Sequence, residues 1–231
     1  MWAILSGIEG NLQAYHAVID DILRQKVSVE EIYILGDIIG ISEENEALVK
    51  EICHPNHSIP LRVCRGWWEE QCLILHSLHS TADPVELIDQ FGVDVTKKLW
   101  DCVSRDTVEW LRGLDFGFVE FDCLLIHGST VNVSEVLTPD TSPWIILDRI
   151  NRVNVNYLFC GRSSQMFDYE LQSGLIESSI VTLDNKSISE VKEVSKKRLI
   201  GVGNIGKTVN IASYTLYNPY NNQLKFRQIN Y

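Results

Sequence analysis

The chain has 231 residues, 45% of them hydrophobic, and this size and composition suit one compact globular domain. The formal net charge is -11, which argues against a sequence-independent grip on nucleic acid or on an anionic membrane surface. No segment approaches the roughly 18 consecutive apolar residues of a membrane span. Six scattered cysteines without a CxxC pair indicate reduced thiols, so we expect a cytoplasmic protein.

The first two thirds of the chain alternate between strand-like and helix-like segments. Near-continuous apolar runs end in glycine-containing turns, which is typical of strands in a sheet buried on both faces. These runs are Trp2–Leu5, Ile32–Leu35 and the runs that end at Arg65, Ile126 and Cys160. Helix-like stretches lie over residues 11–25, 43–53, 84–91, 95–113 and 143–152.

The last third of the chain is typical of β structure. From Tyr169 onward apolar and polar residues alternate, and one short helix is expected near Ser189–Lys197. The closing stretch TVNIASYTLYNPYNNQLKFRQINY has an Asn-Pro-Tyr-Asn-Asn turn between two alternating runs, which predicts a hairpin. Strand–helix alternation followed by antiparallel strands predicts a single α/β domain over residues 1–231, with two packed sheets and helices outside.

The turns after the strands resemble, in the same order, the metal-binding motifs of the calcineurin-like metallophosphoesterases, especially the small bacterial type. That family carries D-x-H, G-D, G-N-H-[DE], a lone H-G and G-H-x-H, where this chain has SGIEGN, GDIIG, RGWWEE, IHGS and CGRSSQ. The stretch IGVGNIG resembles the family's late Asn-Pro-Gly-Ser-Val-Gly turn, so the resemblance extends along the whole chain. It implies a four-layer α/β/β/α sandwich of two mixed sheets flanked by helices.

Most of the family's metal-ligand positions hold other side chains here. Asp37 and His127 keep the family's residue types, and Glu9 stands at the position of a histidine. The remaining positions of this remnant site hold Gly7, Trp67, Trp68, Arg162 and Ser164. Glycine has no ligand atom, tryptophan offers only an N–H donor, and arginine carries a permanent positive charge that repels a cation. By the resemblance, Trp68 stands at the position of the family's catalytic histidine.

These replacements imply that the chemistry was lost on a retained scaffold. We expect a catalytically inactive pseudo-phosphoesterase that needs no cofactor and binds an unknown protein partner or a small anionic ligand. The alternative is a weak phosphoesterase that holds a single Mn²⁺ or Mg²⁺ ion with Glu9, Asp37 and His127. A structural or assembly protein that works through its surface is a third interpretation, which the sequence does not separate from the first.

Two expectations concern the space that the metals would leave. Unpaired carboxylates in a partly dry pocket are costly, so we expect Arg162 within about 6 Å of Asp37 and Glu9, in bidentate contact with carboxylate oxygens. We also expect at least one of the indoles of Trp67 and Trp68 to fill the former cavity. The alternative is that both indoles pack on the neighbouring surface helix or that one lies exposed. An exposed pair would instead indicate a patch for a partner.

Other histidines carry weaker signals. His54 and His57 lie in a proline-containing loop, and His76 and His79 are three residues apart, but none has a visible carboxylate partner. We expect none of these four to hold a metal, and we expect His127 to be a hydrogen-bonded, partly buried histidine. Ser129 follows His127 too closely for the geometry of a catalytic triad.

Overall fold

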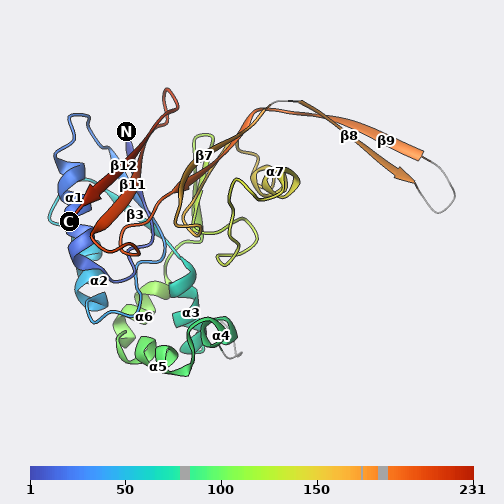
Figure 1. The fold of residues 1–231 in the computed structure, drawn as a ribbon. Helices are drawn as coiled ribbons and strands as arrows, with labels where there is room; N and C mark the ends of the chain where they lie inside the picture. Colours follow the sequence, from blue (N-terminus) through green and yellow to red (C-terminus); the bar gives the residue numbers. More distant parts are fainter. Residues whose placement is uncertain (79–83, 173, 182–186) are drawn as a thin grey trace.

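The structure is a computed structural model that describes residues 1–231 except 79–83, 173 and 182–186 (Figure 1). Its first half contains β1 (Trp2–Leu5), α1 (Leu12–Leu23), β2 (Glu31–Leu35), α2 (Asn45–Cys53), β3 (Leu61–Cys64), α3 (Trp67–Leu75), α4 (Val85–Phe91), α5 (Val93–Asp101) and α6 (Arg105–Arg112). Its second half contains β4 (Gly117–Glu120), β5 (Cys123–Ile126), α7 (Pro143–Asn151), β6 (Tyr157–Cys160), β7 (Met166–Leu171), β8 (Gly174–Val181), β9 (Ser187–Val194), β10 (Lys197–Val202), β11 (Ile211–Asn218) and β12 (Gln223–Asn230).

Two five-stranded mixed sheets form the centre of the molecule. The first has the strand order β12-β11-β1-β2-β3, and the second has the order β4-β5-β6-β10-β7. In the first sheet β1, β2 and β3 are parallel, whereas β11 and β12 are antiparallel to their neighbours. In the second sheet β5, β6 and β10 are parallel, whereas β4 and β7 are antiparallel. The predicted α/β fold of two mixed sheets flanked by helices is therefore confirmed.

The alternation of side chains along each strand divides the core into layers. On β1, Trp2 and Ile4 join the buried cluster between the two sheets, whereas Ala3 and Leu5 join the cluster under the helices that cover the first sheet. A third buried cluster packs the second sheet against α7. Figure 1 shows α3, α4, α5 and α6 gathered at one end of the sheets. Among the described residues, no helix combines the length and apolar character needed to cross a membrane.

The structure corrects three expectations about elements. The helix expected over residues 95–113 is two helices, because Ser104 caps a new helix by accepting a hydrogen bond from the backbone N–H of Thr107. The segment after Gly66 is the helix α3, which was not predicted. The short helix near Ser189–Lys197 is wrong, since these residues belong to the end of β9, the two-residue connection after it and the start of β10. Cross-strand pairing outweighed local propensity there.

The strand ends explain where a site can form. Parallel strands of an α/β sheet bring the loops at their carboxyl ends to one edge. Backbone hydrogen bonds join the loop after β1 to the loop after β2, from Gly7 N to Gly36 O (3.2 Å) and from Glu9 N to Asp37 O (2.9 Å). The loop after β6 is joined to β5 by a bond from Gly161 N to His127 O (2.9 Å). Loops from both sheets therefore meet at this edge.

Candidate functional site

Asp37 lies at the centre of this edge, directly after β2. Its backbone has a left-handed φ of 53°, and the preceding Gly36 (φ 66°) is pressed against Gly66, so that a Cβ on Gly36 would lie 2.3 Å from Gly66 Cα. The Asp37 carboxylate is buried. Its Oδ1 accepts a hydrogen bond from the backbone N–H of Trp68 (2.9 Å), and its Oδ2 lies 3.3 Å from Nε2 of His127. The loops after β2, β3 and β5 thus converge on one carboxylate.

His127 is the ionic partner of Asp37. The side chain is fully buried, not partly buried as expected, and its Nδ1 donates to the carbonyl of Leu35 (2.7 Å). Burial lowers the pKa of His127, but the charge and hydrogen bond of Asp37, the Leu35 carbonyl and the charge of Glu69 together outweigh it and leave the pKa raised. Burial raises the pKa of Asp37, and His127, the Trp68 N–H and Arg162 together bring it below its ordinary value. The two side chains therefore form a buried pair in which each favours the charged form of the other.

Glu69 holds the loops around Asp37 and was not singled out from the sequence. Its carboxylate accepts four backbone N–H bonds of 2.7 to 3.0 Å, from Gly66, Asp37, Ile38 and Ile39. The side chain is fully buried, and burial together with the charge of Asp37 raises its pKa to about 7. The signal was present in RGWWEE, because Glu69 occupies the acidic position of the G-N-H-[DE] motif.

Arg162 lies close to Asp37 but does not form the expected bidentate pair. Its Nη1 is 4.0 Å from Asp37 Oδ2, and its guanidinium carbon lies 4.7 Å from the centre of the Trp67 ring. Both carboxylate oxygens of Asp37 already face other donors, so the guanidinium stacks on the indole. Among the described residues, the buried Nε of Arg162 has no hydrogen-bond partner. Arg162 acts here as a nearby charge and not as a two-pronged donor.

Trp67 and Trp68 are both buried, with exposed fractions of 1% and 6%. Their rings meet edge to face at 5.0 Å, and Nε1 of Trp67 donates to Glu86 on α4 (2.9 Å). The alternative of an exposed indole pair is therefore wrong. Trp67 lies against Arg162, and both indoles also pack against Phe91 of α4, with ring centres 5.9 Å from Trp67 and 5.1 Å from Trp68. The filling of the former cavity stays a prediction.

Gly7, Glu9 and Ser164 line the outer side of the cluster. Gly7 has φ 63°, and a Cβ added to it would lie 3.2 Å from the Cβ of Asn204. Ser164 (φ 58°) accepts hydrogen bonds at its carbonyl from Asn204 (3.0 Å) and at its hydroxyl from the ammonium of Lys207 (3.2 Å). Lys207 is thus a second cation at this edge, and its place in the resembled late turn was the only sequence signal for it.

The surroundings of Glu9 raise the pKa of its carboxyl group. Burial raises its pKa, and the charge of Asp37 adds to that increase. Lys207, the Trp68 side chain and Arg162 act in the opposite direction without cancelling the rise. Glu9 therefore stays within electrostatic reach of both new cations.

These donors do not fit the pair of metal ions that the fold family implies. In the part of the chain that the structure describes, no three His, Cys, Asp or Glu side chains are grouped so that they could hold a metal ion. His127 directs one ring nitrogen to a carbonyl and the other to Asp37, while Arg162 places a positive charge 4.0 Å from the same carboxylate. A metal pair needs neutral imidazoles and several further oxygen donors.

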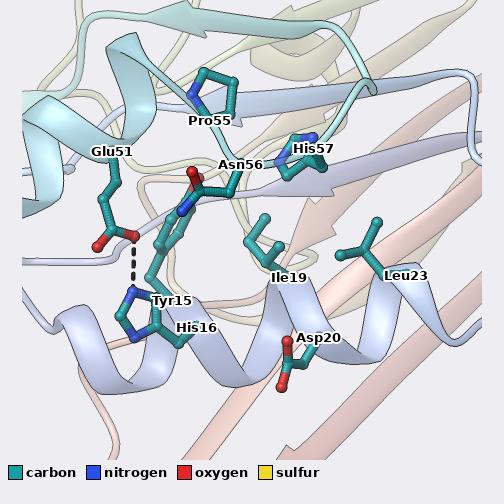
Figure 2. A pocket seen from close by; sticks show the side chains of 9 residues that line it. All are labelled: Tyr15, His16, Ile19, Asp20, Leu23, Glu51, Pro55, Asn56 and His57. Atoms are coloured by element: carbon teal, nitrogen blue, oxygen red, sulfur yellow. Dashed lines mark hydrogen bonds and ion pairs between the residues drawn. The ribbon is translucent and has the colours of Figure 1, made fainter.

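Away from Asp37, a hollow of about 310 Å³ lies between α1 and the loop after α2 (Figure 2). His16 pairs with Glu51 at one end (2.7 Å), and His57 lies over Ile19 at the other. His54 follows α2, and neither it nor His57 belongs to a metal-binding group among the described residues. The hollow carries no reactive arrangement.

The remaining histidine and serine candidates do not form a site either. His76 stacks on Trp100 with ring centres 4.1 Å apart, and His79 lies outside the described residues. Ser129 accepts a hydrogen bond from the N–H of Val131 (3.0 Å). Because both nitrogens of His127 face other groups, Ser129 is not part of a triad.

Comparison with known proteins agrees with the fold. No family model and no curated protein matches the chain. The crystal structure of hypothetical protein PH1004 from Pyrococcus horikoshii OT3 superposes with a TM-score of 0.69 at 20% identity, covering 100% of this chain and 89% of that one. A metallophosphoesterase from Sphaerobacter thermophilus gives a TM-score of 0.66 at 18% identity, covering 100% and 88%. The chain thus has the calcineurin-like metallophosphoesterase fold that its turns predicted.

Proposed function

We propose that this protein is a pseudo-phosphoesterase, a catalytically inactive member of this fold that serves as a binding scaffold. The observation that carries the proposal is the cluster of Asp37, His127 and Arg162. The partly buried guanidinium of Arg162 and the buried ring of His127 already face the one carboxylate that keeps the family's bridging position. The charge that a metal pair supplies in the fold is supplied here by side chains.

These side chains do not replace the metals in chemistry. A metal ion generates a hydroxide at neutral pH by lowering the pKa of a bound water. A guanidinium cannot coordinate a water oxygen as a metal ion does, and neither it nor a doubly protonated imidazole has a lone pair that could take up a proton from water. Trp68 offers only an N–H donor at the position of the family's catalytic histidine. The cluster therefore stabilises charge without producing a nucleophile.

The test is to measure metal content and turnover together. The protein is dialysed against Mn²⁺ and then against metal-free buffer, and it is assayed with bis(p-nitrophenyl) phosphate. We expect manganese well below one equivalent and no hydrolysis above the buffer rate, because Arg162 repels a cation and both ring nitrogens of His127 already face other groups.

The opposite outcome would support the one-metal alternative. One equivalent of manganese with turnover, both lost in Glu9→Gln and in Asp37→Ala and both kept in the exposed control Asp140→Asn, would identify a mononuclear phosphoesterase. Glu9 lies at the outer side of the cluster, so Glu9→Gln reports on ligation even if Asp37→Ala does not fold. Two equivalents would mean that the chain has ligands outside the remnant site.

A further inference from the structure

A groove of about 560 Å³ runs beside the Asp37 cluster, and its walls come from separate parts of the chain. Glu9 and Lys207 lie on the side of the sheets, Glu44 lies before α2, and Trp68 and Phe91 belong to α3 and α4. The groove therefore lies between the strand-end loops and the group of helices at the end of the sheets. Any ligand in it would contact both.

One wall of the groove is aromatic and open to solvent. The Phe91 ring is 45% exposed and packs against Trp68 with ring centres 5.1 Å apart. Ile41, also at the groove, is 38% exposed. Adjacent exposed apolar side chains beside a hollow favour a ligand that has an apolar part.

The charged groups of the groove favour a cationic ligand over an anionic one. Of the described residues that line the groove, Glu9 and Glu44 are acidic and only Lys207 is basic, and Lys207 is turned to the hydroxyl of Ser164. Glu9 also experiences the negative charge of Asp37, which a further cation would offset. The whole chain carries a net charge of -11, so its field attracts positive partners.

We propose that this groove binds a lysine or arginine side chain presented by a linear segment of a partner protein. The alkyl stem packs on Phe91 and Trp68, and the cationic head lies at Glu9 and Glu44. Long basic side chains combine an apolar stem with a charged head, and aromatic faces attract such cations. This inference rests on the proposed function, because it gives the scaffold a class of ligand.

The test is an NMR titration with a defined probe, the acetylated and amidated peptide Gly-Ser-Leu-Lys-Leu-Arg-Leu-Ser-Gly. We expect the indole N–H resonance of Trp68 to shift and the affinity to fall with added salt. Glu9→Gln and Phe91→Ala should each raise the Kd about fivefold, as loss of one ion pair or of the apolar contact with the alkyl stem does. The matched controls Asp140→Asn and Phe116→Ala, outside the groove, should leave the Kd unchanged.

Three results would overturn the inference. These are no binding of the peptide, equal binding of the peptide with glutamates in place of its basic residues, and equal Kd values for the groove and control variants. A Trp68 shift with inorganic phosphate in place of the peptide would assign the groove to anions. If the protein is metal-free and inactive but the peptide does not bind, this inference fails and the proposed inactivity stands. Metal binding with turnover removes the proposed function whatever the peptide does.

Discussion

Asp21 and Asp37 both lie beside an arginine, and the two pairs are built differently. At Asp21 on α1, Arg227 donates from both Nε and Nη2 over 2.8 to 3.2 Å, and the hydroxyl of Tyr214 donates as well (2.6 Å). At Asp37, Arg162 comes no closer than 4.0 Å. The Asp37 carboxylate is instead held by a backbone N–H and by His127.

The difference shows which contacts hold each aspartate in place. The fork of Arg227 matches the Asp21 carboxylate, which is typical of a structural ion pair. Around Asp37 the loops are held by the close approach of Gly36 and Gly66, by the Glu69 carboxylate and by His127. Arg162 adds a positive charge near Asp37 but lies too far from it to donate a hydrogen bond.

The largest expected difference concerns the carboxylates themselves. Asp37→Asn leaves the buried His127 and the partly buried Arg162 without the counter-charge of Asp37, which we expect to cost roughly 3–5 kcal/mol in the free energy of unfolding. Asp21→Asn, at a partly exposed pair, should cost about 1 kcal/mol. Asparagine tolerates the left-handed backbone of residue 37, so the comparison isolates charge. Urea unfolding measures both values, and similar losses would contradict the contrast.

The second difference is in pH dependence. The raised pKa of His127 contributes stability that is present below its unfolded pKa and lost as pH rises through the folded pKa. The pKa of Glu69, raised by burial and Asp37 to about 7, acts in the same direction, because the folded state holds the proton more tightly. We therefore expect the free energy of unfolding to fall by about 1–2 kcal/mol between about pH 5 and about pH 8.

The Asp21 pair should leave that neutral region unchanged. Burial raises the pKa of Asp21, but Arg227 and Tyr214 outweigh it and leave the pKa lowered. Its contribution is present above the unfolded pKa and is lost as pH falls through the folded pKa. We measure the free energy of unfolding at several pH values. Its dependence on pH near neutrality should be weaker in Glu69→Gln, and its fall at acid pH should change only in Asp21→Asn. A wild-type curve that rises toward alkaline pH would reject the assignment of charges.

The smallest expected difference separates charge from fork geometry. A lysine keeps the charge of an arginine and loses its planar pair of donors. Arg227→Lys should cost roughly 1 kcal/mol because two donor atoms contact Asp21, whereas Arg162→Lys should cost about 0.5 kcal/mol through weaker stacking on Trp67. The same urea titrations measure both variants. A larger loss at Arg162 would mean that its guanidinium geometry matters more than its charge.

The sequence predicted the fold well because the glycines that end its strands are local signals. Glycine-terminated apolar runs mark the strands that carry the site, and four of the five lie where expected with little shift of their ends. The strand that ends near Arg65 stops one residue earlier, at Cys64. The helix α3 was not predicted because its first turn carries two indoles in place of typical helix formers. Most of β9 was predicted as a short helix because only its pairing with β8 defines it as a strand.

The sequence predicted which residues gather at the site but not the contacts that they make there. The proximity of Arg162 to Asp37 followed from their shared place in the resembled motifs. Its stacking on Trp67 depends on side chains that lie far apart in the sequence and on the saturation of Asp37 by other donors. The roles of Glu69 and Lys207 likewise arise only when the loops meet.

The hydrogen bond from Trp67 to Glu86 has a consequence for how the molecule opens. The same carboxylate oxygen accepts from Gln71 of α3 (3.4 Å) and from Ser134 in the loop after β5 (3.0 Å). One exposed residue of the short helix α4 therefore joins three segments of the chain. Local unfolding of α4 must break contacts in all three, so this helix and the edge that carries Arg162 belong to one cooperative unit rather than to a hinged flap over it.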